Sequence, residues 1–381
     1  MSRRNPRSQP PASPTPASTV AAPTPAVAPP APAERAATPA ASLSVPSSPI
    51  VRTRVRRTVA IVGAASFLGK NLIGLLEDDD RIERIVAIDV TAPNTAGAKT
   101  RTYEVDLTQP TSEERVAEIL AAERADSLAH VAFLTSPVHG EAWAHEFESV
   151  GTMHLLNAVR QSPVRKLVMW SQTLLYGAHP TNPNFLSERH PLRARRGEPF
   201  FADKIEAEAE VERFAQRASG TVVTILRTAP ILGPTVRNYV SRYLARRFVP
   251  TMMGYDPLLQ FLHEADAIAA FKLALLRDAP GTFNIAAEGV LPLNTVIRLA
   301  GRVAIPIPHP IARPLATASW VAQFAEAPPS FLDYLRYVCV ADGDKAAREM
   351  GFRPAYTTRE ALLDYTSAQR LRDARLLQEA S

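Results

Sequence analysis

The chain has 381 residues, which is enough for one large domain or two smaller ones. Hydrophobic residues make up 46% and charged residues 21%, so most of the chain can bury a core and wholesale disorder is excluded. The net charge is +5, but residues 1–57 carry eight arginines against the single acid Glu34, so the rest of the chain is slightly acidic. We therefore do not expect residues 58–381 to bind nucleic acid through a basic surface.

Cysteine usage and hydropathy narrow the class of protein further. A single cysteine, Cys339, excludes an intrachain disulfide and a cysteine-based zinc site, and we expect no metal site. One unpaired thiol fits a reducing compartment, so the expected location is cytoplasmic. No apolar run reaches the length of about 18 residues that a membrane span needs, and we expect no membrane partner.

The first 57 residues differ from the rest of the chain. They form a leader rich in Pro, Ala and Arg with few large apolar residues, which we expect to be disordered. One interpretation is a partner-binding tail aided by Arg3, Arg4 and Arg7, and the other is a solvated tail. The solvated tail is favoured because composition alone names no partner.

Strand and helix patterns alternate from residue 58 onward. In chain order they predict a strand at 58–62, a helix from Phe67, strands at 84–89 and 127–134, a helix at 141–160, a strand at 166–171, a helix at 200–217 and a strand at 221–227. Strands that alternate with helices of this length form βαβ units around a parallel sheet. The fold class is therefore α/β, a doubly wound parallel sheet of the Rossmann type.

The pattern becomes mixed after Gly233. Helices are predicted at 236–247, 266–277 and 293–301, around short strands at 260–263 and 282–286. We interpret residues 58–235 as a dinucleotide-binding domain and residues 236–381 as a small C-terminal α/β lobe, interleaved with it, that binds the substrate. Ligands in such folds bind at the carboxyl ends of the strands, beside the second lobe.

A dinucleotide motif follows the first predicted strand. Gly63 permits a tight turn, and Gly69 allows the next helix to approach the strand. The start of that helix, at Ser66, Phe67 and Leu68, offers free N–H groups for a diphosphate. Asp89 ends the second strand, where a carboxylate accepts hydrogen bonds from a ribose 2′-hydroxyl and repels a 2′-phosphate, so NAD is expected rather than NADP. An ordinary βα turn is the alternative.

At this point the chain resembles the extended short-chain dehydrogenase/reductases, in particular the NAD-dependent epimerase/dehydratase family that includes UDP-glucose 4-epimerase. The resemblance spans roughly Thr58 to Tyr365. It implies that Asp106 and Leu107 contact the adenine and that Ala132 lies beside the cofactor. Further matches are Tyr176-Gly177, 225–227, 233–234, 261–263, 281–285 and 351–354.

The same resemblance shows where the sequence departs from the family. Its members use a tyrosine in a YxxxK motif to move the proton of a sugar hydroxyl, and the lysine one helical turn later lowers the tyrosine pKa and holds the nicotinamide ribose. Here Lys204 is present, but the tyrosine position is Phe200, which has no proton to exchange. The serine or threonine that assists is replaced by Gln172, so Gln172, Thr173 or Tyr176 would contact the substrate oxygen.

Other departures and candidates are less specific. Ser66 replaces a glycine and can crowd the diphosphate, Glu148 replaces an asparagine, and Pro230 replaces an asparagine that helps to hold substrate. Arginines in the loop 192–196 bind a substrate diphosphate or are simply solvated. His263 and Asp266 line the pocket or, as we favour, order a strand-to-helix turn.

The sequence is compatible with two functions. The first is an atypical NAD-dependent epimerase, dehydratase or oxidoreductase that acts on a nucleotide-sugar-like small molecule. The second is a catalytically inactive NAD-binding protein that regulates or scaffolds a partner. The resemblance also implies a possible homodimer through the helices 141–160 and 200–217.

Overall fold

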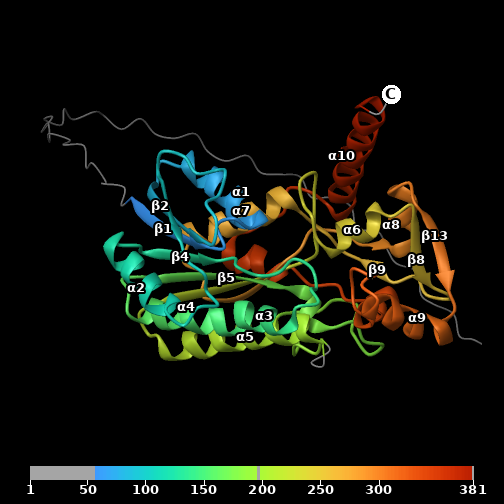
Figure 1. Cartoon of the computed structure of the whole chain (residues 1–381), viewed down its shortest axis with the longest axis horizontal. Coiled ribbons are helices and arrows are strands. Elements are labelled where there is room, and N and C mark those ends of the chain that lie inside the picture. Colours follow the sequence, from blue (N-terminus) through green and yellow to red (C-terminus); the bar gives the residue numbers. More distant parts are fainter. Residues whose placement is uncertain (1–55, 195–197, 380–381) are drawn as a thin grey trace, which may run out of the picture. The chain divides into compact units, whose positions relative to one another are not determined.

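The computed structural model describes residues 56–194 and 198–379, which belong to one compact unit (Figure 1). The predicted leader, apart from Arg56 and Arg57, lies outside the described residues. The same is true of Arg195 and Arg196 in the loop proposed to bind a diphosphate.

A seven-stranded sheet forms the centre of the molecule, and every neighbouring pair of its strands is parallel. The strand order is β11-β6-β5-β4-β1-β2-β3, which reverses direction at β1 as in a doubly wound fold and confirms the predicted class. The strands are β1 (Arg57–Val62), β2 (Ile82–Asp89), β3 (Thr100–Glu104), β4 (Ser127–His130), β5 (Lys166–Gln172), β6 (Val222–Thr228) and β11 (Gly281–Ile285).

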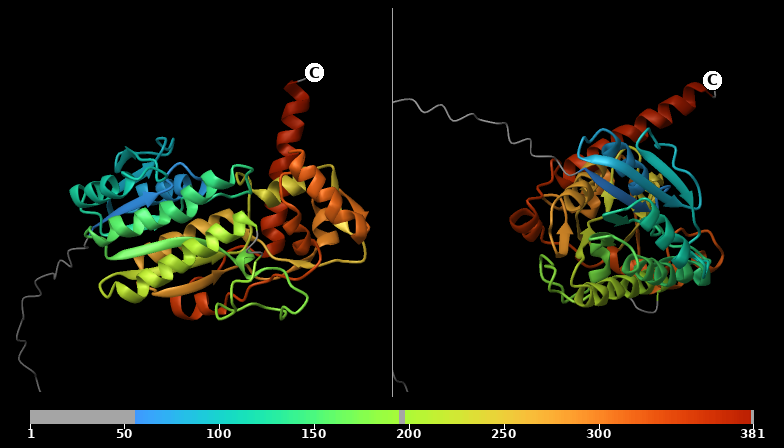
Figure 2. Two further views of the ribbon diagram at one scale, coloured as in Figure 1. Left: turned by 60° about the horizontal axis from the view of Figure 1, so that its bottom comes forward. Right: turned by 90° about the vertical axis from the view of Figure 1, so that its left-hand side faces the viewer.

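Helices cover both faces of this sheet, as Figures 1 and 2 show. On one face α1 (Phe67–Glu77) packs on α7 (Glu264–Leu276). On the other face α2 (Ser112–Ala122), α4 (Gly151–Arg160) and α5 (Pro199–Arg217) lie together. Because both faces are covered, the central strands are largely buried, and β5 is buried at all seven residues.

The helix predicted at 141–160 is interrupted. It consists of α3 (Glu141–His145), a π-helical turn (Glu146–Val150) and α4. A π turn adds a residue to the helical repeat and changes the direction in which side chains point. Here the π turn contains Glu148, whose side chain is buried against α5. The π turn thus positions a residue of the site described below.

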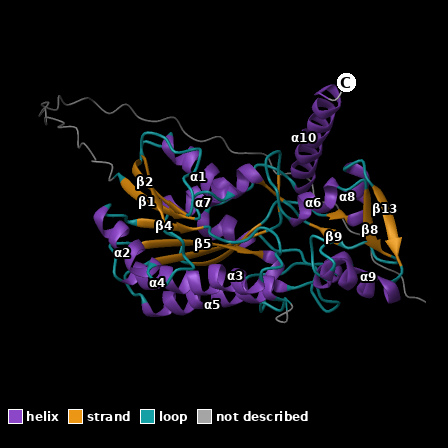
Figure 3. Cartoon of the chain, in the orientation of Figure 1, coloured by secondary structure: helices purple, strands orange, loops and turns teal. Residues whose placement is uncertain are grey.

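The remaining elements form the C-terminal lobe (Figure 3). They are β7 (Ile231–Leu232), α6 (Tyr239–Ala245), β8 (Phe248–Met252), β9 (Leu258–Leu259), β10 (Leu262–His263), β12 (Leu291–Pro292), α8 (Leu293–Leu299), β13 (Val303–Ile307), α9 (His309–Val321) and α10 (Thr358–Glu379). Three two-stranded sheets join β10 to β7, β12 to β9 and β13 to β8. Within the described residues, no helix has the length and apolar character that crossing a membrane requires.

Several element boundaries differ from those predicted. The strand predicted at 127–134 ends at His130, because the chain then turns beneath the nucleotide-binding turn instead of continuing along the sheet. The patterns gave no prediction for β3, α2, β8, β13, α9 or α10. All five residues of β3 are half-buried or exposed, so β3 lacks the continuous apolar run that marked the other strands.

Candidate active site

A cleft opens at the carboxyl ends of β1, β5 and β6. Parallel sheets of this kind bind ligands at that edge, where the strand order reverses. The residues that line the cleft are Ser66, Phe67, Leu68, Thr135, Trp170, Gln172, Leu174, Thr228, Ala229, Pro230, Ile231, Val236, Arg237, Asn238 and Tyr239. The cleft therefore joins the predicted nucleotide-binding turn to the end of β5 and the start of α6.

The turn after β1 is tight because two glycines let the backbone approach closely. Gly63 has a φ of +88°, in the left-handed region, and a Cβ there would lie 2.5 Å from the backbone nitrogen of Ala132. A Cβ on Gly69 would lie 2.2 Å from the carbonyl oxygen of Gly63. A side chain at position 63 would clash with the backbone after β4, and one at position 69 would push α1 away from the turn, so both glycines are required by the packing.

The N-terminus of α1 faces the cleft. The Ser66 hydroxyl accepts a hydrogen bond of 3.0 Å from the N–H of Gly69, so this side chain caps the helix. The N–H groups of Phe67 and Leu68, in the first turn, have no acceptor within the described chain, and both residues line the cleft. Two free donors at a helix N-terminus fit the diphosphate of a dinucleotide.

Asp89, at the end of β2, supports the same turn. Its carboxylate accepts one hydrogen bond of 2.8 Å from the N–H of Ala65 and another of 2.7 Å from the N–H of Val90. Each oxygen keeps a second lone pair for a ribose hydroxyl. The residues expected at the adenine lie on the next loop, where Asp106 binds the N–H and hydroxyl of Thr108 and Leu107 is buried.

The predicted catalytic lysine is held by an acid. Lys204 donates to both carboxylate oxygens of Glu148, at 2.6 and 2.8 Å, and both side chains are almost completely buried. The Lys204 ammonium also lies 3.9 Å from the centre of the Phe200 ring. The lysine therefore rests against the face of the phenylalanine and the carboxylate, and neither Lys204 nor Phe200 lines the cleft.

Burial acts on both members of this pair. It raises the pKa of Glu148 and lowers the pKa of Lys204, while the partner's charge opposes each change. Glu148 also accepts a hydrogen bond of 2.6 Å from the N–H of Leu134, beyond the end of β4. Because Lys204 and Glu148 bind each other between α5 and the π turn, Lys204 is placed to stabilise the packing of these two segments.

The three candidates at the end of β5 have different surroundings. Gln172 lines the cleft, and within the described residues its amide makes no side-chain hydrogen bond. Thr173 is buried behind it. Tyr176 is also buried, and its hydroxyl donates to Asn284 Oδ1 at 2.8 Å and accepts from Arg227 at 2.9 Å.

The Tyr176 network is structural. Burial raises the pKa of Tyr176 to about 12, and its hydroxyl is already used twice. Arg227 continues the network to the buried carboxylate of Glu208 at 2.8 Å. The structure thus brings Gln172 to the cleft and keeps Tyr176 away from it.

Three cleft residues at the start of α6 were not identified from the sequence: Arg237, Asn238 and Tyr239. Arg237 is exposed and lines the cleft, and Asn238 caps α6. The Tyr239 ring packs 5.3 Å from that of Phe331, and its buried hydroxyl has no hydrogen-bond partner within the described chain. Burial raises the pKa of Tyr239 well above its usual value. Only the folded chain brings these side chains beside β5, so no local spacing marks them.

The remaining candidates lie elsewhere. His263 accepts from the N–H of Ala265 at 3.1 Å and pairs with Asp364 at 3.0 Å, while Asp266 accepts from the N–H groups of Ala355 and Tyr356. His263 therefore caps the start of α7, as we favoured, whereas Asp266 joins α7 to the loop at Ala355 and Tyr356. In the loop 192–196, the described Arg193 binds Asn182 and is exposed.

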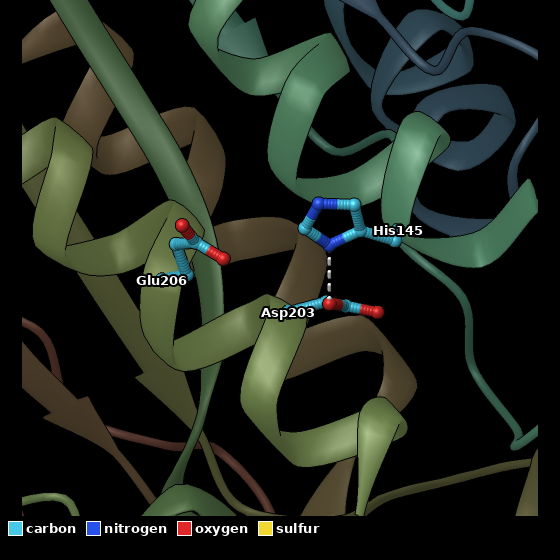
Figure 4. Close-up of side chains that lie close together, drawn as sticks. All are labelled: His145, Asp203 and Glu206. Atoms are coloured by element: carbon cyan, nitrogen blue, oxygen red, sulfur yellow. Dashed lines mark hydrogen bonds and ion pairs between the residues drawn. The ribbon is translucent and has the colours of Figure 1, made fainter. Parts of the chain in front are cut away.

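A further cluster joins α3 to α5 (Figure 4). His145 Nδ1 lies 2.8 Å from Asp203 Oδ1, and the donor atoms of His145, Asp203 and Glu206 lie within 4.8 Å of one another. In the close-up only His145 and Asp203 are joined by a hydrogen bond. The hydrogen bond to Asp203 raises the pKa of His145. We interpret this cluster as a link between two helices, outside the cleft.

Comparisons with known proteins agree with this geometry. The family described as "NAD dependent epimerase/dehydratase family" matches residues 59–286. The protein Rv0501 of Mycobacterium tuberculosis is 32% identical over 316 residues, which cover 81% of this chain and 83% of that one. A 3-diazoavenalumate denitrifying reductase of a Streptomyces species is 26% identical over 246 residues, which cover 61% of this chain and 77% of the reductase.

Solved structures share the fold. A UDP-glucose 4-epimerase from Thermotoga maritima, crystallised with UDP-glucose, has a TM-score of 0.65 at 18% identity, and the match covers 83% of this chain and 99% of the epimerase. The matching family is NAD-dependent, which confirms the cofactor predicted from the sequence. The free donors at the start of α1 and the carboxylate of Asp89 are the groups on this chain that fit it.

Proposed function

Because the chain belongs to the NAD-dependent epimerase/dehydratase family, we propose that it is an NAD-dependent oxidoreductase whose proton step does not use the family's tyrosine and lysine. The bound nicotinamide supplies hydride transfer. The proposal rests on one observation: Lys204 is held in a buried ion pair with Glu148 and lies against the ring of Phe200. The nucleotide-binding turn after β1 still lines the cleft.

Tyr239 is the proton donor in this proposal. Among the residues that line the cleft, Tyr239 is the one with a phenol hydroxyl. Phe200 lacks this proton-donating group. A raised pKa keeps the phenol protonated, which suits a donor rather than a base. Tyr239 packs on Phe331, whose ring lies 5.8 Å from that of Phe200, so both positions belong to one aromatic cluster.

The substrate class is nucleotide-sugar-like. The likeness to a UDP-glucose 4-epimerase supports this class, and the exposed Arg237 in the cleft supplies a cation for a substrate phosphate. Gln172 donates a hydrogen bond to the reacting oxygen in this arrangement. The relative that is a reductase supports net hydride transfer. The cytoplasmic location and the homodimer inferred from the sequence stay predictions.

A second candidate function rests on the same ion pair. If the inward-facing lysine and the phenylalanine have removed proton transfer altogether, the chain binds NAD and acts on a partner without turnover. This is the inactive regulatory or scaffold protein considered from the sequence.

One set of measurements separates the two. The purified chain is denatured and any released nucleotide is identified by mass, and the intact protein is then assayed at 340 nm with NAD and a panel of sugar nucleotides. We expect NAD in the first step and turnover in the second, and Tyr239→Phe should lower the rate by roughly 10²–10⁴-fold without lowering NAD content. NAD without turnover on any sugar nucleotide supports the inactive candidate, and absence of NAD binding contradicts both.

A restoration experiment tests the role assigned to the ion pair. Phe200→Tyr with Gln172→Ser restores the usual hydroxyl groups but leaves Lys204 held by Glu148. We therefore expect added activity only when Glu148→Asn is introduced as well, since the lysine is then free to face the new phenol. Equal gains with and without the third substitution would show that Glu148 does not restrain Lys204.

A further inference from the structure

The outer face of the β8–β13 sheet is apolar and uncovered. The two strands pair in parallel with Val303 opposite Phe248 and Ile305 opposite Pro250, so these side chains share one face. Phe248, Val303 and Ile305 are 54%, 53% and 45% exposed. The opposite face packs Val249 on α8, so the sheet already buries one side and the second apolar side has no partner within the described chain.

Helix α9 follows β13 directly and presents the same character. Ile311, Leu315 and Val321 are 55%, 51% and 74% exposed, and Phe324, just after the helix, is 85% exposed. The helix is fixed from its other side, where the Trp320 ring stacks on His139 with 3.8 Å between centroids. Figures 1 and 3 place β8, β13 and α9 together at one end of the lobe. We call the exposed apolar side chains of these three elements and Phe324 the lobe surface.

The charge around the lobe surface is mainly positive, and the exposed acids Asp256, Glu288 and Glu326 lie directly outside its segments. Residues 236–255 and 289–325, which contain α6, β8, α8, β13 and α9, include seven arginines and no aspartate or glutamate. The exposed arginines that adjoin the surface in the sequence are Arg246 and Arg247, just before Phe248, and Arg313, between Ile311 and Leu315. Arg247 lies over the ring of Phe248 at 5.5 Å. Since the chain after residue 57 is slightly acidic as a whole, this basic region is a local feature and does not follow from composition.

We propose that the lobe surface docks on an anionic lipid membrane, with its apolar side chains in the outer acyl region and its arginines at the headgroups. Exposed apolar residues with several arginines beside them and few acids match what an anionic interface binds. A second copy of the chain fits less well, because a two-fold interface would oppose one arginine-rich surface to another. The sequence-based expectation of no membrane partner considered only spanning segments, and this surface forms only when three separate elements fold together.

Vesicle sedimentation of the full chain tests the proposal. Phosphatidylcholine vesicles are compared with vesicles that also contain phosphatidylglycerol. We expect binding to the anionic vesicles and at least a tenfold loss for Val321→Asp with Phe324→Asp, two substitutions at exposed positions. Phe185→Asp is the matched control, because Phe185 is 55% exposed on a loop outside the lobe surface, and it should bind like the parent.

A second pair of variants separates charge from apolar contact. Arg246→Gln with Arg247→Gln leaves every apolar side chain in place and should weaken anionic binding by about fivefold for each arginine. The basic leader is present in all variants, so it cannot produce a difference between them. The proposal is wrong if both pairs bind like the parent, or if light scattering without lipid shows a dimer that the aspartate pair disrupts while vesicle binding persists.

Discussion

The nucleotide-binding turn after β1 and the region around Lys204 on α5 respond differently to sequence change. At the first, the backbone sets the geometry: Gly63 and Gly69 allow a close approach, and N–H groups at the start of α1 face the cleft. At the second, individual side chains decide the chemistry. Lys204 keeps its place on α5, but Glu148 and Phe200 give it other contacts. A residue at a motif position therefore keeps the motif's role only while its neighbours remain the same.

The largest expected effect comes from breaking the buried pair. Glu148→Ala leaves the Lys204 ammonium buried without a counter-charge, so we expect the free energy of unfolding to fall by about 3–5 kcal/mol. Urea unfolding followed by circular dichroism measures this change. The control is Glu148→Leu with Lys204→Met, which removes both charges and should cost much less. Equal losses in the two proteins would show that the pair contributes through packing alone.

A smaller effect is expected at the nucleotide-binding end. Asp89→Ala removes the carboxylate expected at the ribose, so NAD affinity should fall by about 10- to 100-fold, as for charged hydrogen bonds worth about 1.5–3 kcal/mol. Calorimetric titration with NAD measures it. Glu104→Ala is a matched control, because Glu104 is the exposed partner of Asp89 in the β2–β3 register. If Asp89→Ala binds NAD as tightly as the parent, the Asp89 carboxylate is not part of the binding site.

The smallest effect concerns the link between α3 and α5. Asp203 raises the pKa of His145 above its unfolded value, so the pair stabilises the protein fully below the unfolded pKa and loses this contribution as pH rises through the folded pKa. His145 is 47% exposed, so solvent limits the contribution to about 0.5 kcal/mol. His145→Gln should therefore lower the free energy of unfolding slightly more at pH 5.5 than at pH 8. An unchanged pH dependence would contradict this assignment.

The sequence predicted the features that local physics dictates. Continuous apolar runs mark buried parallel strands, and glycines mark the tight turn, so the sheet class, the turn and NAD followed from pattern and resemblance. The absence of a tyrosine at position 200 was equally readable. These features depend on residues that are near one another in the chain.

What the sequence did not predict depends on contacts between distant segments. The partner of Lys204 lies 56 residues away and reaches it through a π turn that the helical periodicity hides. Tyr239 enters the cleft wall because α6 begins beside β5. The role of Tyr176 as a packed network residue required its contact with Asn284, 108 residues away.

The outermost strand on the β6 side, β11, limits how this protein can be divided. It is supplied by residues 281–285, after the chain has already built part of the C-terminal lobe. A chain truncated after residue 235 would lack β11, so the buried strand β6 would have an unpaired edge. Such edges promote aggregation. Recombination that exchanges substrate lobes between relatives must therefore keep β11 with its own sheet, which requires two crossover points instead of one.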